Sequence, residues 1–277
     1  MTKKNLIKFI LFVTIFITIY SALIEPSLLV VRKYSIENIK NNQSNKTLKL
    51  VQITDTQIGS FYGMKKLSDM VDKVNSLNAD IVVFTGDLID SSTKKADLKE
   101  ISSNLKRIDA NLAKFSIFGN HDYRNNRKKD YEEIMKKSGF KLLVNDEEKI
   151  YLDNKKVINI IGLDEILSGN PNFKILENKD SKVVNEFNLL LLHEPDLVDK
   201  IKMNSVDLAL SGHTHGGQIR IPFKGALATP PYGREYTKGF YNIKGNELYV
   251  SSGLGSTKLP FRLFNIPEIV EFEISIN

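Results

Sequence analysis

From residue 48 onward the apolar positions alternate between strand-like and helix-like spacing. Residues 48–54 and 81–85 are short apolar runs, whereas 64–77 and 98–108 carry apolar side chains at steps of three and four. A continuous apolar run suits a strand buried on both faces, and three- and four-residue steps suit an amphipathic helix. With a further strand over 115–118, the pattern predicts a βαβαβ start and therefore a layered α/β architecture.

The rest of the chain predicts mainly strands, with little helix between them. The expected strands are 156–162, 187–192, 206–210, 216–221, 247–251 and 268–275. Such a succession favours a pair of mixed sheets. No internal repeat or Pro/Gly/Ser-rich linker divides this part, so we expect one large domain over residues 48–277.

The N-terminus has a different pattern. Lysines precede an apolar run over residues 9–24, interrupted only by hydroxyl side chains. A membrane-spanning helix needs about 20 such residues, and Leu6 and Ile7 extend the run if Lys8 reaches the interface. A cleaved signal would need small residues before the cut, and bulky Tyr20 disfavours a cut after Ala22. We favour an uncleaved anchor and keep a removed signal as the alternative.

The sequence therefore predicts three segments: an anchor over 1–35, an Asn-, Ser- and Lys-rich tether over 36–47, and the domain over 48–277. Three lysines precede the apolar run, and Glu25, Arg32 and Lys33 follow it. By the positive-inside rule, this distribution mildly favours a single-pass protein of the cell membrane with its domain on the extracytoplasmic side.

Composition narrows the chemistry. The chain has no Cys, which excludes disulfides, thiolate metal sites, thiol catalysis and lipid-modified cysteine. The net charge of +6 comes largely from dispersed lysines, and no basic patch interleaved with aromatic residues stands out. A basic balance can indicate nucleic acid or an anionic membrane, but dispersed lysines favour a solvated surface. We expect no nucleic-acid partner.

The four histidines all fall at the ends of apolar runs, beside turn-forming residues. Two carboxylates end earlier runs in the same way. The ordered series is Asp55-Thr56-Gln57, Gly86-Asp87, Gly119-Asn120-His121-Asp122, His193 and Gly212-His213-Thr214-His215. Loops at strand ends are where open α/β folds place reacting groups. Imidazoles and carboxylates without thiols indicate one or two hard-to-borderline metal ions.

Each residue alone has an ordinary structural explanation. Asp55 and Asp87 could cap helices, and His193 could be a hydrogen-bonded loop residue. His213 and His215 are two apart, so in a strand they would face the same side, and paired imidazoles on one side make a metal-ligand geometry. The full series favours a metal site over these separate explanations.

This series resembles the calcineurin-like metallophosphoesterases, whose pattern runs D-x-H, G-D, G-N-H-[DE], H and G-H-x-H. The resemblance covers roughly residues 48–275. It implies a β-sandwich flanked by helices, and a site in which water activated by two divalent ions attacks phosphorus. By resemblance, one ion is held by Asp55, Gln57, Asp87 and His215, and the other by Asp87, Asn120, His193 and His213.

The same resemblance gives roles to two residues that bind no metal. His121 would act as a general acid at the leaving group, and Asp122 would orient it. Gln57 stands where the family usually has histidine. An amide oxygen is harder than imidazole, so manganese or magnesium is expected before zinc, with iron and cobalt as further alternatives. Gln57 could instead only hydrogen-bond a metal-bound water.

The C-terminal part contains four stretches of note, at 212–220, 249–255, 260–262 and 267–269. By these stretches it resembles membrane-associated bacterial phosphoesterases, some relatives of which hydrolyse UDP-2,3-diacylglucosamine. Arg220, Arg234 and Arg262 are candidates to bind substrate phosphate, with structural ion pairs as the alternative. We therefore expect a membrane-anchored, monomeric hydrolase of phosphate mono- or diesters, with a substrate that could be lipid-linked. The alternative is a non-catalytic member that binds metal or a partner, and the retained His121 argues against it.

Overall fold

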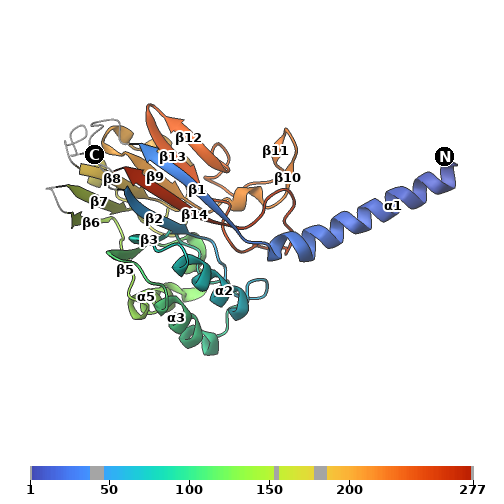
Figure 1. The fold of residues 1–277 in the computed structure, drawn as a ribbon, viewed down its shortest axis with the longest axis horizontal. Coiled ribbons are helices and arrows are strands. Elements are labelled where there is room, and N and C mark those ends of the chain that lie inside the picture. The colour runs from blue at the N-terminus through green and yellow to red at the C-terminus, as the bar shows by residue number, and fades with distance from the viewer. Residues whose placement is uncertain (1, 38–46, 153–155, 178–185, 276–277) are drawn as a thin grey trace.

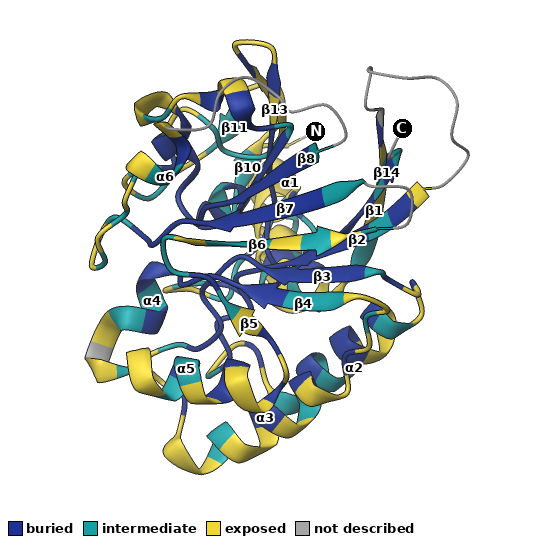
Figure 2. Ribbon diagram, turned by 90° about the vertical axis from the view of Figure 1, so that its left-hand side faces the viewer, coloured by how far each residue is buried: buried dark blue, intermediate teal, exposed yellow. Residues whose placement is uncertain are grey.

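The computed structural model describes residues 2–37, 47–152, 156–177 and 186–275. Two six-stranded sheets face each other, and helices cover the outer face of the first sheet (Figures 1 and 2). The mixed α/β sandwich expected from the sequence is confirmed.

The first sheet has the order β1-β14-β2-β3-β4-β5. Its strands are β1 (Val30–Glu37), β2 (Thr47–Ile53), β3 (Ile81–Phe84), β4 (Ala113–Ser116), β5 (Lys141–Leu142) and β14 (Glu268–Ser275). Strands β2 to β5 run parallel, and β14 is antiparallel to β2. The carboxyl ends of the parallel strands therefore meet at one edge of the sheet.

The second sheet has the order β12-β13-β9-β8-β7-β6. Its strands are β6 (Asp146–Tyr151), β7 (Val157–Gly162), β8 (Glu186–Leu191), β9 (Leu208–Ser211), β12 (Gly239–Ile243) and β13 (Asn246–Val250). The four central strands are parallel, whereas β6 and β12 pair antiparallel at the edges. A small hairpin of β10 (Arg220–Ile221) and β11 (Gly225–Ala226) stands apart from both sheets (Figure 1).

Apolar side chains fill three layers. One cluster lies between the two sheets, and a second joins the first sheet to its helices. The helices of this layer are α2 (Met64–Asn75), α3 (Leu98–Lys106), α4 (Asn120–Tyr123) and α5 (Lys128–Lys137), whereas α6 (Lys174–Glu177) packs on the second sheet. In α2 the buried residues Leu67, Met70, Val71 and Val74 repeat at helical spacing and pack on the first sheet. A third cluster covers the outer face of the second sheet.

The N-terminal helix α1 (Lys3–Ile19) continues through helical turns at Tyr20–Ile24 and Glu25–Ser27. Over Lys3–Ser27 it is long and apolar enough to cross a membrane, and nearly all of its side chains are exposed. Figure 1 shows it projecting from one end of the sandwich.

The boundary expected between anchor, tether and domain differs from the structure. Residues 30–37 form strand β1, which pairs in parallel with β14 along its whole length. The helix therefore enters the sheet through residues 28 and 29, and residues 1–35 are not a separate anchor. Of the expected tether, 36–37 belong to β1, 47 belongs to β2, and 38–46 lie outside the described residues.

The strand expected over 216–221 is also largely absent. A 3-10 turn occupies His215–Gly217, and only Arg220–Ile221 is extended in a strand. Gly216, Gly217 and Gln218 all have positive φ, a conformation that ends strand geometry. The two adjacent glycines favour this turn, so the expectation of a strand over 216–221 is wrong for 216–219.

Candidate metal centre

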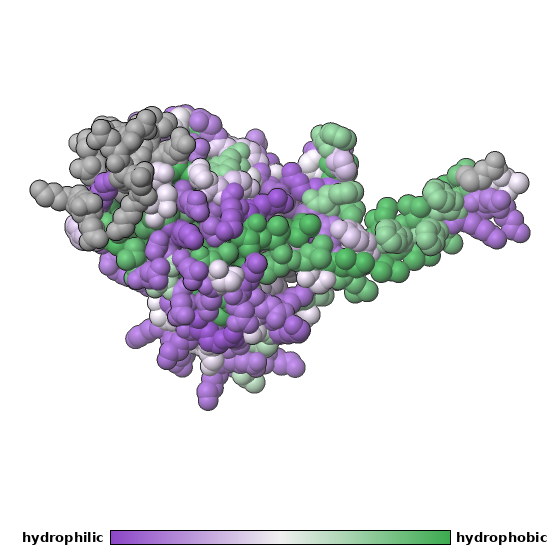
Figure 3. Space-filling model, viewed as in Figure 1, coloured by the Kyte–Doolittle hydropathy of each residue, from purple (hydrophilic) through white to green (hydrophobic). Residues whose placement is uncertain are grey.

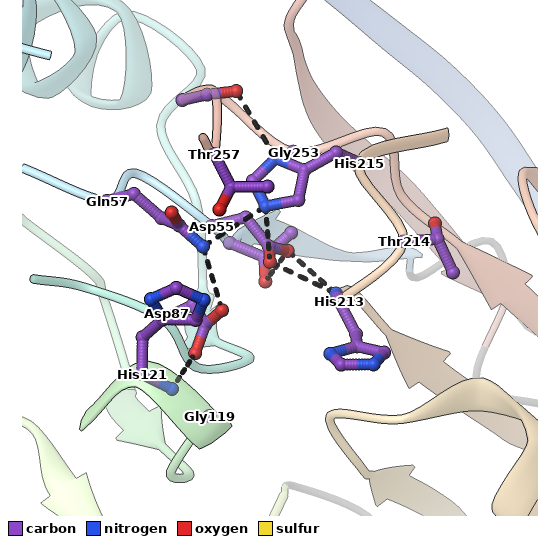
Figure 4. A network of polar contacts seen from close by, with 12 residues as sticks. Asp55, Gln57, Asp87, Gly119, His121, His213, Thr214, His215, Gly253 and Thr257 are labelled. Carbon is purple, nitrogen blue, oxygen red and sulfur yellow. Dashed lines mark hydrogen bonds and ion pairs between the residues drawn. The ribbon is translucent and has the colours of Figure 1, made fainter. Parts of the chain in front are cut away.

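The polar series lies at the carboxyl ends of the central strands of both sheets. From the first sheet, Asp55 and Gln57 follow β2, Asp87 follows β3, and Asn120 follows β4. From the second sheet, His193 follows β8, and His213 and His215 follow β9. The two sets meet where the backbone N–H of His213 donates to both carboxylate oxygens of Asp55, at 3.0 and 3.1 Å (Figure 4).

One half of the cluster joins Asp55, Asp87 and His215, which together could hold a metal ion. His215 Nε2 lies 3.5 Å from Asp55 Oδ1. Gln57 extends into the same space: its amide nitrogen lies 2.9 Å from Asp87 Oδ2 and 3.2 Å from His215 Nε2. The amide oxygen of Gln57 is buried and has no hydrogen-bond partner among the residues that the structure describes. A half-turn of the amide exchanges these two atoms and turns the oxygen toward the carboxylates.

The other half contains Asn120, His193 and His213. Asn120 Oδ1 lies 3.1 Å from His213 Nδ1, and His193 Nε2 lies 3.4 Å from Asp87 Oδ2. His193, Glu194 and His213 also form a group that could hold a metal ion. Asp87 approaches both halves and lies between them.

The three buried histidines share one arrangement. Each has one ring nitrogen against a backbone carbonyl: His193 Nδ1 on Thr85 at 2.7 Å, His213 Nε2 on Pro231 at 2.8 Å, and His215 Nδ1 on Gly255 at 3.3 Å. A carbonyl can only accept, so each of these nitrogens carries the proton. The other nitrogen of each ring then turns a lone pair into the cluster, as a metal-ligating histidine does.

His213 and His215 do not share one side of a strand, contrary to expectation. Strand β9 ends at Ser211, and both histidines have positive φ, 69° and 49°. Their rings consequently point in different directions (Figure 4). His213 reaches Asn120 and His215 reaches Asp55, so they serve different halves of the cluster.

Burial and mutual charge perturb the ionisable groups of the cluster. Burial lowers the pKa of both His213 and His215 to about 3, with the charge of His193 adding at His213 and that of Arg262 at His215. Both rings are therefore neutral near pH 7, as metal ligands must be. Burial raises the pKa of Asp55 to about 7; Asp87 adds to this effect and His193 opposes it.

Asp87 and His193 shift in opposite ways. Burial acts to raise the pKa of Asp87, but the charges of His193 and His121 outweigh it and hold the pKa below its usual range. Burial acts to lower the pKa of His193, yet Asp87 and Asp55 raise it well above the usual value. The buried carboxylates thus attract positive charge to the centre, and without a metal that charge includes a proton on Nε2 of His193. A bound cation would replace this proton and use the lone pair of Nε2, which fits a cation site.

Two glycines allow the loops to approach each other closely. A side chain at Gly86, where φ is 94°, would collide with Gly119 and with the His193 ring. A side chain at Gly212 would collide with the carboxylate of Asp55 and with Thr54. The turn glycines of the sequence series therefore provide space as well as backbone freedom.

His121 lies at the edge of the cluster and is partly exposed. Its backbone N–H donates to Asp87 Oδ1 at 2.8 Å, and its ring Nε2 lies 3.1 Å from a guanidinium nitrogen of Arg124. Asp122 does not contact that ring in the described part of the chain. Its buried carboxylate accepts backbone N–H groups of Asp87, Leu88 and Gly119 at 2.8 to 3.0 Å. Asp122 therefore shapes the loop that carries Asp87, and its expected role of orienting His121 is not what the contacts support.

Arg262 was expected to contact substrate, and the structure contradicts this. Its side chain is fully buried and donates to the backbone carbonyls of Ser252, Gly253, Gly255 and Asn265. All of its nitrogens are occupied in holding these loops. Arg220 is partly buried and donates to the carbonyl of Gly216 at 2.8 Å, and Arg234 is exposed.

Two residues near the cluster, Arg124 and Glu194, were not expected from the sequence. Arg124 touches the ring of His121, and a basic residue three positions beyond His121 was the available signal. Glu194 is fully buried beside His193, and in the described part of the chain its Oε1 has no hydrogen-bond partner. Burial raises its pKa to about 8. Its adjacency to His193 could have marked it.

A buried cluster of carboxylate, amide and imidazole groups at the strand ends of an α/β sandwich defines a metal-dependent hydrolase. The family model described as "Calcineurin-like phosphoesterase" matches residues 48–217. The chain is 33% identical over 255 residues to the uncharacterized metallophosphoesterase YkuE of Bacillus subtilis, covering 92% of this chain and 88% of that protein. The chain belongs to the calcineurin-like phosphoesterase family, as its sequence pattern predicted, and it is a metal-dependent phosphoesterase.

Two further relatives extend this comparison. Phosphodiesterase YaeI of Escherichia coli is 25% identical over 254 residues, covering 90% of each chain. A Danio rerio protein named "Transmembrane protein with metallophosphoesterase domain" is 28% identical over 233 residues, which is 80% of this chain. The chain spans about half of that relative, 52% of its length.

Proposed function

We propose that the chain is a membrane-anchored phosphoesterase with two metal ions, which hydrolyses phosphate mono- or diesters at the membrane surface. The observation that carries the proposal is the shared arrangement of the three buried histidines. Each ring is fixed by a backbone carbonyl and turns a lone pair toward buried carboxylates. This is the donor set and the orientation that divalent metals require.

The ligand assignment follows the two halves of the cluster. Asp55, Gln57, Asp87 and His215 would hold one ion, and Asp87, Asn120, His193 and His213 would hold the other. Oδ2 of Asp87 contacts Gln57 in one half and His193 in the other, so its negative charge would lie between the two cations. The unpartnered amide oxygen of Gln57 supports its role as a ligand, and its hardness favours manganese or magnesium over zinc, iron or cobalt.

Bound ions would lower the pKa of a water and stabilise charge on the phosphoryl oxygens. His121 would then act on the leaving group: its backbone is fixed on Asp87, while its ring remains accessible at the edge of the cluster. Arg124 holds that ring by its Nε2, which makes the imidazole an acceptor before substrate binds. A substrate phosphate would attract Arg124 and release Nε2 to carry and donate a proton.

The membrane part of the proposal rests on the exposed, apolar α1, and a relative named as a transmembrane protein supports it. We infer a single-pass anchor with the domain on the extracytoplasmic side, since lysines precede the span. A lipid-linked phosphoester such as UDP-2,3-diacylglucosamine would fit this location. The monomeric state also stays a prediction.

The test is hydrolysis by the purified full-length chain in detergent. The substrates are an aryl phosphomonoester, an aryl phosphodiester and a nucleotide-lipid pyrophosphate, each with manganese, zinc and magnesium. We expect turnover of at least one ester, highest with manganese, and two ions per chain by elemental analysis. Two bound ions without turnover of any ester would favour a binding protein, and absence of stoichiometric metal would contradict the centre itself.

A further inference from the structure

The two helical turns that follow α1, Tyr20–Ile24 and Glu25–Ser27, are bound to a loop of the domain. The backbone N–H of Arg262 donates to the carbonyl of Ser21 at 2.8 Å. The carboxylate of Glu25, itself buried, accepts the backbone N–H groups of Phe264, at 3.1 Å, and of Asn265. These contacts fix the loop directly beside the last turns of the helix.

The length of α1 places this loop relative to a bilayer. The apolar stretch from residue 6 to residue 24 would be roughly 28 Å long at 1.5 Å per residue, close to the hydrocarbon thickness of about 30 Å. Ser21 and Glu25 would therefore lie at the membrane boundary. Because the 262–265 loop is hydrogen-bonded to both, the domain would lie on the membrane surface with no spacer.

The surface next to this contact is apolar and basic. We call it the α1-proximal face: the β10–β11 hairpin region, 219–227, and the loop 258–264. The two parts are joined by hydrogen bonds, from Arg220 N–H to the Leu263 carbonyl and from Leu263 N–H to the Gln218 carbonyl. Figure 1 shows the hairpin at the same end of the domain as α1, and Figure 3 shows apolar side chains on both.

Five large apolar side chains are exposed on this face, of which Ile221 is the least exposed at 38%. Phe223 at the hairpin tip is wholly exposed, and Leu227, Leu259 and Phe264 are each more than half exposed. Phe223 and Phe264 also have positive φ, 65° and 56°, which is unfavourable for bulky residues. Exposed aromatic rings in a strained backbone conformation are unfavourable in water. They are expected where another apolar surface covers the rings when the protein functions.

The charge of the face is one-sided. Residues 212–234 and 248–267 contain no Asp or Glu, and the exposed Lys224 and Lys258 lie beside the apolar side chains. Lysines near an anionic lipid surface contribute about 1 kcal/mol each to binding. Apolar side chains flanked by lysines fit the boundary between headgroups and acyl chains.

We propose that the α1-proximal face inserts into the interface of the same bilayer that α1 spans, with anionic lipid as its partner. This inference rests on the proposed membrane anchor. The face would hold the metal centre at a fixed orientation to the lipid surface, because Arg220 and Asn265 on its flank bind the carbonyls of Gly216 and His215.

The test uses the absence of tryptophan from the chain. Phe223→Trp and Leu259→Trp each introduce a single fluorophore on the face. Tyr151→Trp is the matched control, because Tyr151 is equally aromatic and well exposed but ends β6, away from α1 (Figure 1). The full-length variants are reconstituted into phosphatidylcholine–phosphatidylglycerol vesicles, with and without brominated acyl chains that quench nearby tryptophan.

Side chains at an interfacial surface lie about 5–10 Å into the headgroup region, so we expect brominated lipid to remove about half of the emission of both face variants. Tyr151→Trp should be unaffected. If the chain stays in the vesicles after alkaline carbonate washing but Phe223→Trp is unquenched, the proposed insertion of the α1-proximal face is wrong. The proposed membrane anchor is then still supported. Release by carbonate would contradict the anchor and the face together. Blue-shifted but unquenched emission would mean that a second copy of the chain covers Phe223, which would also overturn the proposal.

Discussion

Replacing Asp87 by Asn tests the two-metal centre most directly, because only the charge between the two halves changes. Asparagine has the same shape, and its amide oxygen can still accept the backbone N–H of His121, now 2.8 Å from Asp87 Oδ1. The fold should therefore survive. The substitution, however, leaves only one carboxylate among the proposed ligands in place of two. Two divalent ions carry four positive charges, which one carboxylate compensates less well. We expect the variant to retain at most one ion.

The expected loss of metal affinity in Asp87→Asn follows from the burial of Asp87. Asp87 is 1% exposed, so almost no water can replace its charge. Removing one partner of a buried charge pair costs about 3–5 kcal/mol. At 1.4 kcal/mol per tenfold, the affinity for the weaker-bound ion should fall by between about a hundredfold and a few thousandfold. Turnover should fall at least as far, since activation of water depends on both ions.

The measurement is metal content per chain after dialysis against metal-free buffer, together with hydrolysis of an aryl phosphodiester. Asp69→Asn is the matched control: it is the same substitution, at an exposed position of α2 where the carboxylate pairs only with exposed Lys65 among the contacts described. Such surface pairs contribute about 0–1 kcal/mol, so this variant should match the unmodified chain. Two retained ions with full turnover in Asp87→Asn would refute the bridging role.

Three further predictions concern chemistry, metal choice and the domain boundary. His121→Ala should keep both metals and lower turnover by about 10²–10⁴-fold, less for esters with good leaving groups; metal loss in elemental analysis would instead make His121 a ligand. Gln57→His should shift preference from manganese toward zinc in metal titrations, whereas Gln57→Ala should weaken one ion only; unchanged affinities in both would place Gln57 outside the ligand set. Deleting residues 1–28 should leave a soluble, active domain, whereas deleting 1–37 removes β1, exposes the edge of β14 and should cause aggregation in size-exclusion chromatography.

The pattern of apolar runs was sufficient to predict the central strands, because β2, β3, β8 and β9 are short and apolar, and each leads into a motif residue. It could not predict β1. Its partner β14 lies more than 230 residues away in sequence, and no local pattern encodes such a pairing. The charged residues of β1 face partners that only the fold supplies: Arg32 pairs with Glu268 and Lys33 with Glu271.

Roles that depend on the backbone were also beyond the sequence. From the sequence, Arg262 was a candidate to bind substrate phosphate. In the structure it donates to the backbone carbonyls of four different residues, which no sequence pattern indicates. Asp122 reads as a partner of His121 because it is adjacent, yet its oxygens face backbone N–H groups. The type of a side chain limits the interactions that it can make. The backbone groups around it determine which of these interactions it makes in the fold.

The backbone of the centre carries its own evidence of function. Asp55, Gln57, Asp87, His213 and His215 all have positive φ, between 44° and 69°. A residue other than glycine in this region costs on the order of 1 kcal/mol or more, and it persists only where the surroundings enforce it. Glycine would relieve the strain at each position, but it would remove the side chain that the centre needs. Five of the seven proposed ligands thus have a strained backbone, and the same cluster contains buried charge. Both are unfavourable without a ligand, and bound cations would offset both.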